Sequence, residues 1–174
     1  MQNQVIPSNK IKALLFGDSY TGKTALLTRY FQDNFNNFPS IGIDFRNKVL
    51  KQQGQELIKV GIWEFYLTGR YSFKSPLISG CPFIIICYDI TNRSSFQKIF
   101  DWCQYFKQDS NNNTELLVLI GNKCDLKEQR QVSSQEGQQI AESLGIAFFE
   151  VSAKTGDQVK EAFDYFFEKL ISLN

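Results

Sequence analysis

The chain contains no histidine, and its four cysteines, Cys81, Cys87, Cys103 and Cys124, do not form a CxxC pair. These absences exclude catalytic triads that use histidine as the base, and they disfavour a zinc site. The 19 basic and 18 acidic residues leave a net charge of only +1. This balance provides no overall field to attract nucleic acid or an anionic membrane, so we expect no nucleic-acid partner. Any bound anion must be held by a local device.

Long apolar runs are also missing: no segment approaches the roughly 20 residues that span a membrane. The first ten residues are polar, unlike a signal peptide. With 43% hydrophobic residues among 174, the chain has enough apolar surface for one core. We therefore predict a cytoplasmic, monomeric protein made of a single domain over residues 1–174.

Short apolar runs predict strands at residues 13–16, 57–63, 83–88, 116–120 and 146–151. Several are apolar at consecutive positions, which is typical of strands covered on both faces in a parallel sheet between helices. A further strand at 44–51, a turn at 52–55 and the strand that starts at 56 predict a hairpin at one edge of the sheet. The pattern indicates an α/β fold.

Apolar residues spaced three and four apart predict amphipathic helices at 96–106 and 159–171. Residues 36–44 and 68–76 fit neither period, and we expect mobile loops or a frayed helix there. The polar segment 108–114 is expected to be a surface loop.

Residues 17–24 read GDSYTGKT, which matches GxxxxGK[ST] between a strand and the helical segment 25–30. In such a loop the backbone amides and the following helix N-terminus surround a phosphate. Lys23 is expected to reach the outer phosphates, and Thr24 to ligate Mg²⁺. We assign phosphate contacts to Ser19, Tyr20, Thr21, Gly22, Lys23, Thr24 and Ala25. Tyr20 replaces the usual small residue, and its ring is expected to point away from the nucleotide.

Residues 122–125, NKCD, follow another apolar strand and provide a candidate base site. The Asp125 carboxylate can accept two hydrogen bonds from the N1–H and 2-amino groups of guanine, a pair that adenine lacks. Lys123 can lie over the purine, and Asn122 can tie the loop to the phosphate cradle. Leu126 and, after the last strand, Ser152, Ala153 and Lys154 complete the predicted base contacts. Either segment alone could be an ordinary solvated turn, but their order after a phosphate loop favours a base site.

With these three motifs, the chain resembles the Ras superfamily of small GTPases from about residue 11 to residue 171. The segments IGIDF at 41–45 and CYDIT at 87–91 are similar to Rab proteins. The resemblance implies a six-stranded, mostly parallel sheet flanked by helices, the fold of the P-loop NTPases. It also implies GTP or GDP with Mg²⁺, GTP hydrolysis, and a nucleotide-dependent switch in vesicle traffic that is read by effectors, exchange factors and activating proteins.

Switch I departs slightly from the family pattern. Phe35 resembles the aromatic residue that flanks the guanine. Ser40 stands where Rab proteins have a threonine that closes on Mg²⁺, and it keeps the hydroxyl.

Switch II departs further: WEFYLTGR at 63–70 replaces the WDTAGQE of Rab proteins. Glu64 is expected to act on the metal through water. Thr68, or Arg70 in the other alignment, replaces the glutamine that orients the attacking water. Lys23 with Thr68 or Arg70 is therefore the candidate catalytic set, and impaired hydrolysis is predicted because both alignments lose the amide.

Two of the three aromatic residues that Rab effectors commonly contact are matched by Phe45 and Trp63, while Leu77 takes the third position. Both rings could instead be core. No cysteine follows Cys124, so either a prenylated tail was trimmed or no lipid is attached. We expect trimming, and only through such a tail would the protein sit peripherally on endomembranes.

Two alternatives stay open. One is a pseudo-GTPase scaffold that binds nucleotide without cycling, favoured by Leu67 and Thr68. The other is a P-loop kinase acting on a small molecule, which would not need Asp125. Competition between GTP and ATP separates the kinase from the GTPase reading.

Overall fold

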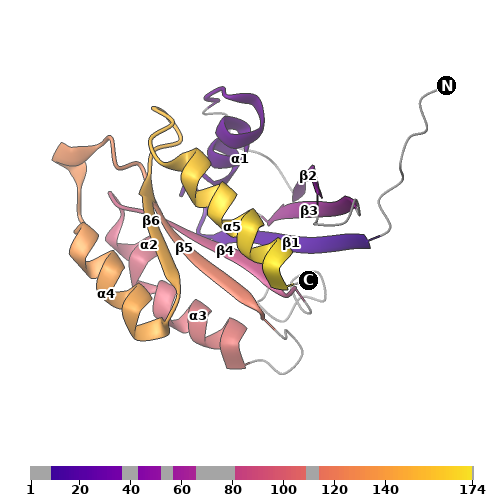
Figure 1. Cartoon of the computed structure of the whole chain (residues 1–174). Helices are drawn as coiled ribbons and strands as arrows, with labels where there is room; N and C mark the ends of the chain where they lie inside the picture. Colours follow the sequence, from indigo (N-terminus) through magenta and orange to yellow (C-terminus); the bar gives the residue numbers. More distant parts are fainter. Residues whose placement is uncertain (1–8, 37–42, 52–56, 66–80, 109–113, 174) are drawn as a thin grey trace.

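The computed structural model describes residues 9–36, 43–51, 57–65, 81–108 and 114–173. In chain order the elements are β1 (Asn9–Gly17), α1 (Lys23–Gln32), β2 (Ile43–Lys51), β3 (Leu57–Phe65), β4 (Phe83–Asp89), α2 (Arg93–Gln97), α3 (Ile99–Gln108), β5 (Leu116–Asn122), the 3₁₀ turn η1 (Lys127–Gln129), α4 (Ser134–Leu144), β6 (Ala147–Val151) and α5 (Val159–Leu173). Figure 1 shows the sheet at the centre of these elements.

The described strands form one six-stranded sheet in the order β2-β3-β1-β4-β5-β6. Strand β1 pairs in parallel with both β3 and β4, while β2 pairs antiparallel with β3. The predicted α/β fold, a mostly parallel sheet with an antiparallel edge, is confirmed. The predicted turn at 52–55 lies outside the described residues.

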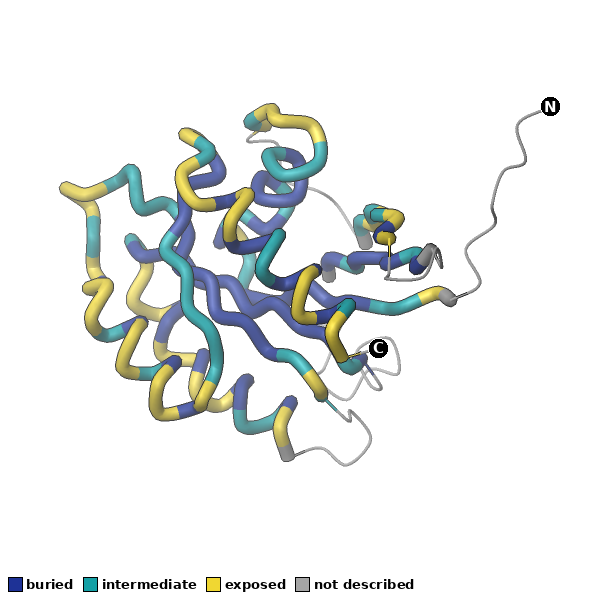
Figure 2. The backbone as a smooth tube through the Cα atoms, viewed as in Figure 1, coloured by how far each residue is buried: buried dark blue, intermediate teal, exposed yellow. Residues whose placement is uncertain are grey.

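Two apolar clusters cover the two faces of the sheet. Helices α1 and α5 pack on one face, and α2, α3 and α4 on the other. The central strands β4 and β5 contribute to both clusters, which is why their sequences are apolar at consecutive positions. In Figure 2 these strands are dark blue, whereas the outer sides of α4 and α5 include exposed residues.

The boundaries differ from the sequence prediction at several points. Most strands are longer than their apolar runs, because pairing continues through polar or small residues such as Gly17 and Asn122. Residue 43, predicted as loop, belongs to β2, as does residue 44, where the predicted loop and the predicted strand overlapped. Of the rest of that predicted loop, the structure describes only Asn36, which is irregular, and residues 37–42 lie outside the described ranges.

The predicted helix at 96–106 is two helices that meet at Lys98. The backbone N–H of Lys98 donates to the carbonyl of Phe96 instead of to a residue four positions earlier, so the helical ladder is interrupted. Phe100 belongs to the apolar spacing that predicted this helix, but its side chain is 47% exposed. The Lys98 side chain forms an ion pair with Asp18.

Helix α4 was not predicted from its weakly apolar sequence. It begins with a capping box, in which Ser133 accepts from the N–H of Glu136 and the Glu136 carboxylate accepts from the N–H of Ser133. It ends at Gly145, which has a left-handed φ of 62°. No helix in the described part of the chain is long and apolar enough to cross a membrane.

Candidate functional site

The carboxyl ends of the parallel strands lie along one edge of the sheet, so the loops after β1, β5 and β6 meet there. They surround a cavity of about 460 Å³, a size usual for a small-molecule site. The lining residues are Tyr20, Gly22, Lys23, Thr24, Ala25, Phe35, Asn36, Glu64, Asn122, Lys123, Asp125, Leu126, Ala153 and Lys154.

The turn into α1 is shaped by Gly22. Its φ of 91° is left-handed, and a Cβ at this position would lie 2.3 Å from the side-chain Nδ2 of Asn122. Only glycine fits here. Gly22 provides no side-chain cap for α1, and the first turn of this helix contains no acidic residue. Helix α4, by contrast, has a side-chain cap from Ser133 and the acidic residue Glu136 in its first turn. The N-terminus of α1 therefore presents backbone amides and the positive end of its dipole to an external anion.

Lys23 lies at the base of this loop and is only 3% exposed. Its Nζ donates to the carbonyl oxygens of Gly17 at 3.0 Å and Asp18 at 2.8 Å. Burial lowers the pKa of Lys23, and the nearby Glu64 carboxylate opposes that shift. A buried cation is thus held beside the helix N-terminus.

Glu64, near the end of β3, is 2% exposed and contacts the P-loop. Its Oε1 accepts a 2.6 Å hydrogen bond from the hydroxyl of Thr24. Its Oε2 is buried and has no hydrogen-bond partner among the described residues. Burial raises the pKa of Glu64, while the hydrogen bond from Thr24 and the charge of Lys23 lower it.

A hydroxyl and a buried carboxylate with a spare oxygen are donors that suit Mg²⁺. No group of three His, Cys, Asp or Glu side chains in the described ranges could hold a metal by itself. A cation here would therefore need ligands beyond these side chains.

Asn122 joins the two predicted loops to each other. It is 1% exposed, and its Nδ2 donates to the Thr21 carbonyl at 2.8 Å. Its Oδ1 accepts from the Ala153 N–H at 3.1 Å. One buried amide thus ties the phosphate loop to the loop after β6. The predicted contact of Asn122 with the phosphate loop is confirmed.

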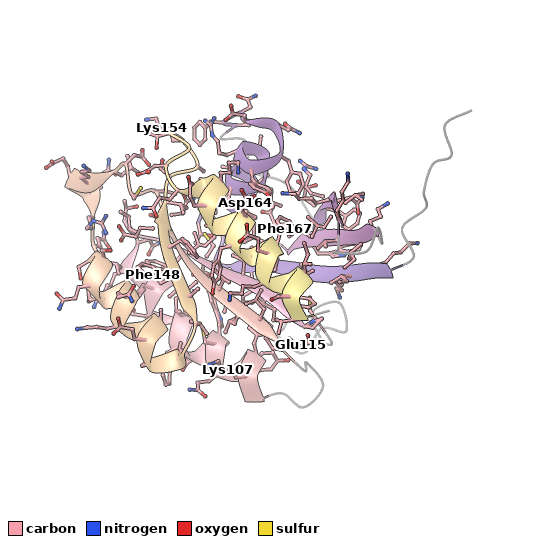
Figure 3. All side chains as sticks on the ribbon, in the orientation of Figure 1. Lys107, Glu115, Phe148, Lys154, Asp164 and Phe167 are labelled. Atoms are coloured by element: carbon pink, nitrogen blue, oxygen red, sulfur yellow. The ribbon has the colours of Figure 1, made fainter. Side chains whose placement is uncertain are left out.

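The side of the cavity formed by Asp125 is braced from the loop after β6. The Ser152 hydroxyl donates to Asp125 Oδ1 at 2.6 Å and accepts from the Thr155 N–H at 3.1 Å. Arg29 of α1 donates to the carbonyl oxygens of Ala153 at 2.9 Å and Lys154 at 2.8 Å. In Figure 3, Lys154 lies at the loop before α5, next to the α1 end of the molecule.

Most of the predicted site residues that the structure describes line this cavity, Glu64 and Phe35 included. Ser19, Thr21 and Ser152 are not among its lining residues; Thr21 and Ser152 support the wall through hydrogen bonds. Tyr20 has a left-handed φ of 66°, and it is 76% exposed although it lines the cavity. Ser40, Thr68, Arg70 and Leu77, with the predicted loop at 68–76, lie outside the described residues.

One lining residue, Asn36, was missed by the sequence analysis. It follows Phe35 in a segment that belongs to no motif, so only its neighbour provided a signal. The ion pair between Lys98 and Asp18 was also missed, because no spacing in the sequence connects the junction of α2 and α3 with the phosphate loop.

Phe45 and Trp63 form a separate aromatic pair across β2 and β3. Their ring centroids are 4.5 Å apart with the planes tilted by 45°. Phe45 is 38% exposed, whereas Trp63 is partly buried against the cluster under α2, α3 and α4. Thus one ring is partly exposed at the surface, and the other packs against the core.

Comparison with known proteins gives a consistent result. A profile described as the Ras family matches residues 12–172. The chain is 41% identical to Ras-related protein Rab-13 of Bos taurus over 157 residues, covering 87% of this chain and 75% of that protein. It is 39% identical to Ras-related protein Rab-3 of Caenorhabditis elegans over 165 residues, covering 93% of this chain and 73% of the relative. It is 40% identical to GTP-binding protein ypt2 of Schizosaccharomyces pombe over 156 residues, covering 88% and 77%.

Proposed function

Since this chain belongs to the Ras family and its relatives include Rab proteins, we propose that it is a Rab-like GTPase that switches between GTP and GDP in vesicle traffic. The observation that carries the proposal is the cavity where the P-loop, the NKCD loop and the loop after β6 are tied together by Asn122. The P-loop would hold the phosphates, and the other two loops the base.

Asp125 would select guanine. Its Oδ1 already accepts from Ser152, which fixes the orientation of the carboxylate toward the cavity that Asp125 lines. The N1–H and 2-amino groups of guanine would donate to it, while adenine has no such pair of donors. This arrangement also separates the GTPase from a P-loop kinase, which would not need Asp125.

Competition binding with a fluorescent GDP analogue tests this assignment. We expect GTP to displace the analogue at least 100-fold better than ATP, and Asp125→Ala to lower that ratio mainly by weakening GTP. Asp157→Ala is a matched control, because this carboxylate on the neighbouring loop is not among the cavity-lining residues. An unchanged ratio in Asp125→Ala would count against guanine recognition by this residue.

For Mg²⁺ we propose Thr24 as a ligand, Glu64 as a contact through water, and Ser40 as the switch I hydroxyl. The buried Oε2 of Glu64, which has no hydrogen-bond partner in the described part of the chain, and the neighbouring Thr24 hydroxyl support this assignment. When bound, the ion would neutralise phosphate charge. The experiment is Mg²⁺ titration of GDP retention: Glu64→Gln should need about tenfold more Mg²⁺, as expected for losing one charge-assisted contact. Equal Mg²⁺ requirements would remove Glu64 from the site.

Hydrolysis is proposed to be slow without a helper protein. The positions that carry the catalytic aspartate and glutamine of Rab proteins hold Glu64 and Thr68, and Arg70 follows two residues later. Lys23 is retained and would stabilise charge on the phosphates. Single-turnover hydrolysis, with and without an activating protein, tests this proposal. Recovery of fast turnover by Thr68→Gln alone would show that Leu67 and Glu64 do not limit the rate.

A pseudo-GTPase that binds nucleotide without cycling is the second candidate, favoured by Leu67 and Thr68. The two readings differ in the nucleotide that co-purifies with the protein: GDP for a working cycle, and GTP for a protein that does not turn over. An activating protein should accelerate hydrolysis only in the first case.

Partners would bind at the switch face. The half-exposed Phe45 beside Trp63 offers aromatic area for an effector, with Leu77 as the third expected contact. We further propose a monomer that works in the cytoplasm and peripherally at endomembranes through a prenylated tail, as the Rab resemblance implies. Phe45→Ala should reduce effector capture while leaving GDP binding unchanged, because Phe45 does not line the cavity.

A further inference from the structure

Asp89, the last residue of β4, is a buried carboxylate that the assignments above do not use. It is 6% exposed and lies opposite Asn122 in the pairing of β4 with β5. Its Oδ1 accepts from the Thr91 N–H at 2.8 Å and from the Thr91 hydroxyl at 2.7 Å. Its Oδ2 forms an ion pair with the Lys123 ammonium at 2.6 Å. Both carboxylate oxygens therefore have partners, and one of these partners, Lys123, lines the cavity.

Lys123 is fixed at both ends of its side chain. Its backbone has a left-handed φ of 72°. At the other end, Nζ donates to the carbonyl of Tyr20 at 2.9 Å while it pairs with Asp89. Between these ends the stem passes the P-loop, where Cε lies 4.0 Å from the place that a Gly22 Cβ would occupy. The aliphatic stem thus forms a fixed part of the cavity wall.

We propose that Asp89 is a positioning residue for nucleotide binding, which acts by holding Lys123 in place as a platform for the purine. The inference rests on the proposed function, since it assumes a purine in this cavity. A lysine has many rotamers, and ordering it during binding weakens affinity. Asp89 orders it beforehand, because the carboxylate is itself held by Thr91 and buried at the end of a central strand.

The alternative is that Asp89 only stabilises the turn between β4 and α2. Thr91→Val distinguishes the two roles, because it removes the hydroxyl contact to Oδ1 and leaves the backbone contact and the Lys123 pair in place. A turn-stabilising role predicts that Thr91→Val and Asp89→Asn weaken GDP binding alike. The positioning role predicts a large effect only for Asp89→Asn.

The experiment is a double-mutant cycle on the full chain with Asp89→Asn, Lys123→Met and the double variant. Dissociation constants are measured for GDP and for inosine diphosphate, together with the melting temperature of each nucleotide-free variant. Inosine lacks the 2-amino group, so the ratio of the two constants reports base contact to Asp125 and not the platform. Glu136→Gln is a matched control, because it removes an ion pair with Arg93 remote from the cavity lining.

We expect Asp89→Asn to weaken GDP and inosine diphosphate about equally, by roughly tenfold, since a contact between charged groups is lost. The ratio of the two constants should stay within about twofold. In the Lys123→Met background the same change should alter GDP affinity by less than about twofold, because the partner is already gone. Glu136→Gln should leave both constants unchanged.

Equal losses from Asp89→Asn in the presence and absence of Lys123 would overturn the proposal, since the two residues would then act independently. A change of more than about twofold in the ratio of the GDP and inosine diphosphate dissociation constants would also overturn the proposal, because Asp89 would then act on base contact instead. Failure of the unaltered protein to bind GDP at all would instead refute the proposed function, and this result is distinguishable from either outcome.

Discussion

Asn122 gives the sharpest test of how the site is assembled, and Asn122→Ala is the perturbation. The change removes two hydrogen bonds: the Ala153 N–H loses the Asn122 amide oxygen, and the Thr21 carbonyl keeps only a long contact from the Cys87 thiol at 3.7 Å. Thr21 is 1% exposed and Ala153 is 4% exposed, so bulk water does not readily replace the amide.

The magnitude follows from these two contacts. Each buried group left unsatisfied costs about 1–3 kcal/mol. Because both groups are near the cavity, where some water can enter, we expect a loss of about 2–4 kcal/mol in the free energy of unfolding. For a chain of this size each kcal/mol lowers the melting temperature by about 2–4 °C, so the shift should be about 4–16 °C.

The assay is urea unfolding of the nucleotide-free protein, followed by GDP titration of the same variant. Affinity for GDP should fall at least about tenfold, because Asn122 holds together both loops that form the cavity. Gln138→Ala is the control: it removes a side-chain amide that donates to Glu142 on the exposed face of α4, and it should cost less than about 0.5 kcal/mol. A loss below about 1 kcal/mol with unchanged GDP affinity would refute the reasoning.

Three further predictions concern stability, reactivity and pH. Gly137→Ala adds a Cβ that would lie 2.5 Å from both Phe148 Cζ and the Tyr88 hydroxyl. Overpacking should outweigh the roughly 1 kcal/mol gain in helix propensity, so urea unfolding should show a net loss of about 1–2 kcal/mol in the free energy of unfolding. A more stable variant would contradict this prediction. Burial, with Asp157 nearby, raises the pKa of Cys124 to about 11, so iodoacetamide labelling at pH 7.5, followed by mass spectrometry, should be about 100-fold slower than for an ordinary thiol; labelling at the ordinary rate would show that the thiol is not so shielded. Hydrogen bonds from the Ser133 N–H and, second, from Arg93 lower the pKa of Glu136 to about 2. The contribution of the ionised Glu136 to folding stability is therefore complete above the ordinary pKa near 4.5 and is lost as the pH falls through about 2. An NMR titration of the Glu136 carboxyl with its midpoint near 4.5 would disagree.

Much of the fold was predictable, because a strand buried on both faces needs apolar residues at consecutive positions whatever its neighbours are. The strands at the centre of the sheet show this clearly. Helix α4 was missed, since Ile140, Ala141 and Leu144 are its few inward apolar residues and its start depends on a capping box. The interruption at Lys98 was also missed, because the apolar spacing continues through it and does not report the local backbone hydrogen bond.

The candidate site was predictable to the extent that its motifs are contiguous. A phosphate loop needs successive backbone amides and glycines at fixed offsets, so GDSYTGKT is readable as a string. The contacts that join the loops are different. Glu64 bonds to Thr24 across 40 positions, and Asn122 to Thr21 across 101. No periodicity specifies such pairs.

The amino-acid sequence by itself determined the alternation of strands and helices, the phosphate loop and the residues offered to a guanine, because backbone conformation and hydrogen-bonding capacity are local properties. Only the tertiary structure decided that Asp89 contacts Lys123, that Asn122 joins two loops, and that one oxygen of Glu64 is buried with no partner among the residues that the structure describes. These features depend on which strand ends lie next to each other in the sheet, and that order is set by packing of the whole chain.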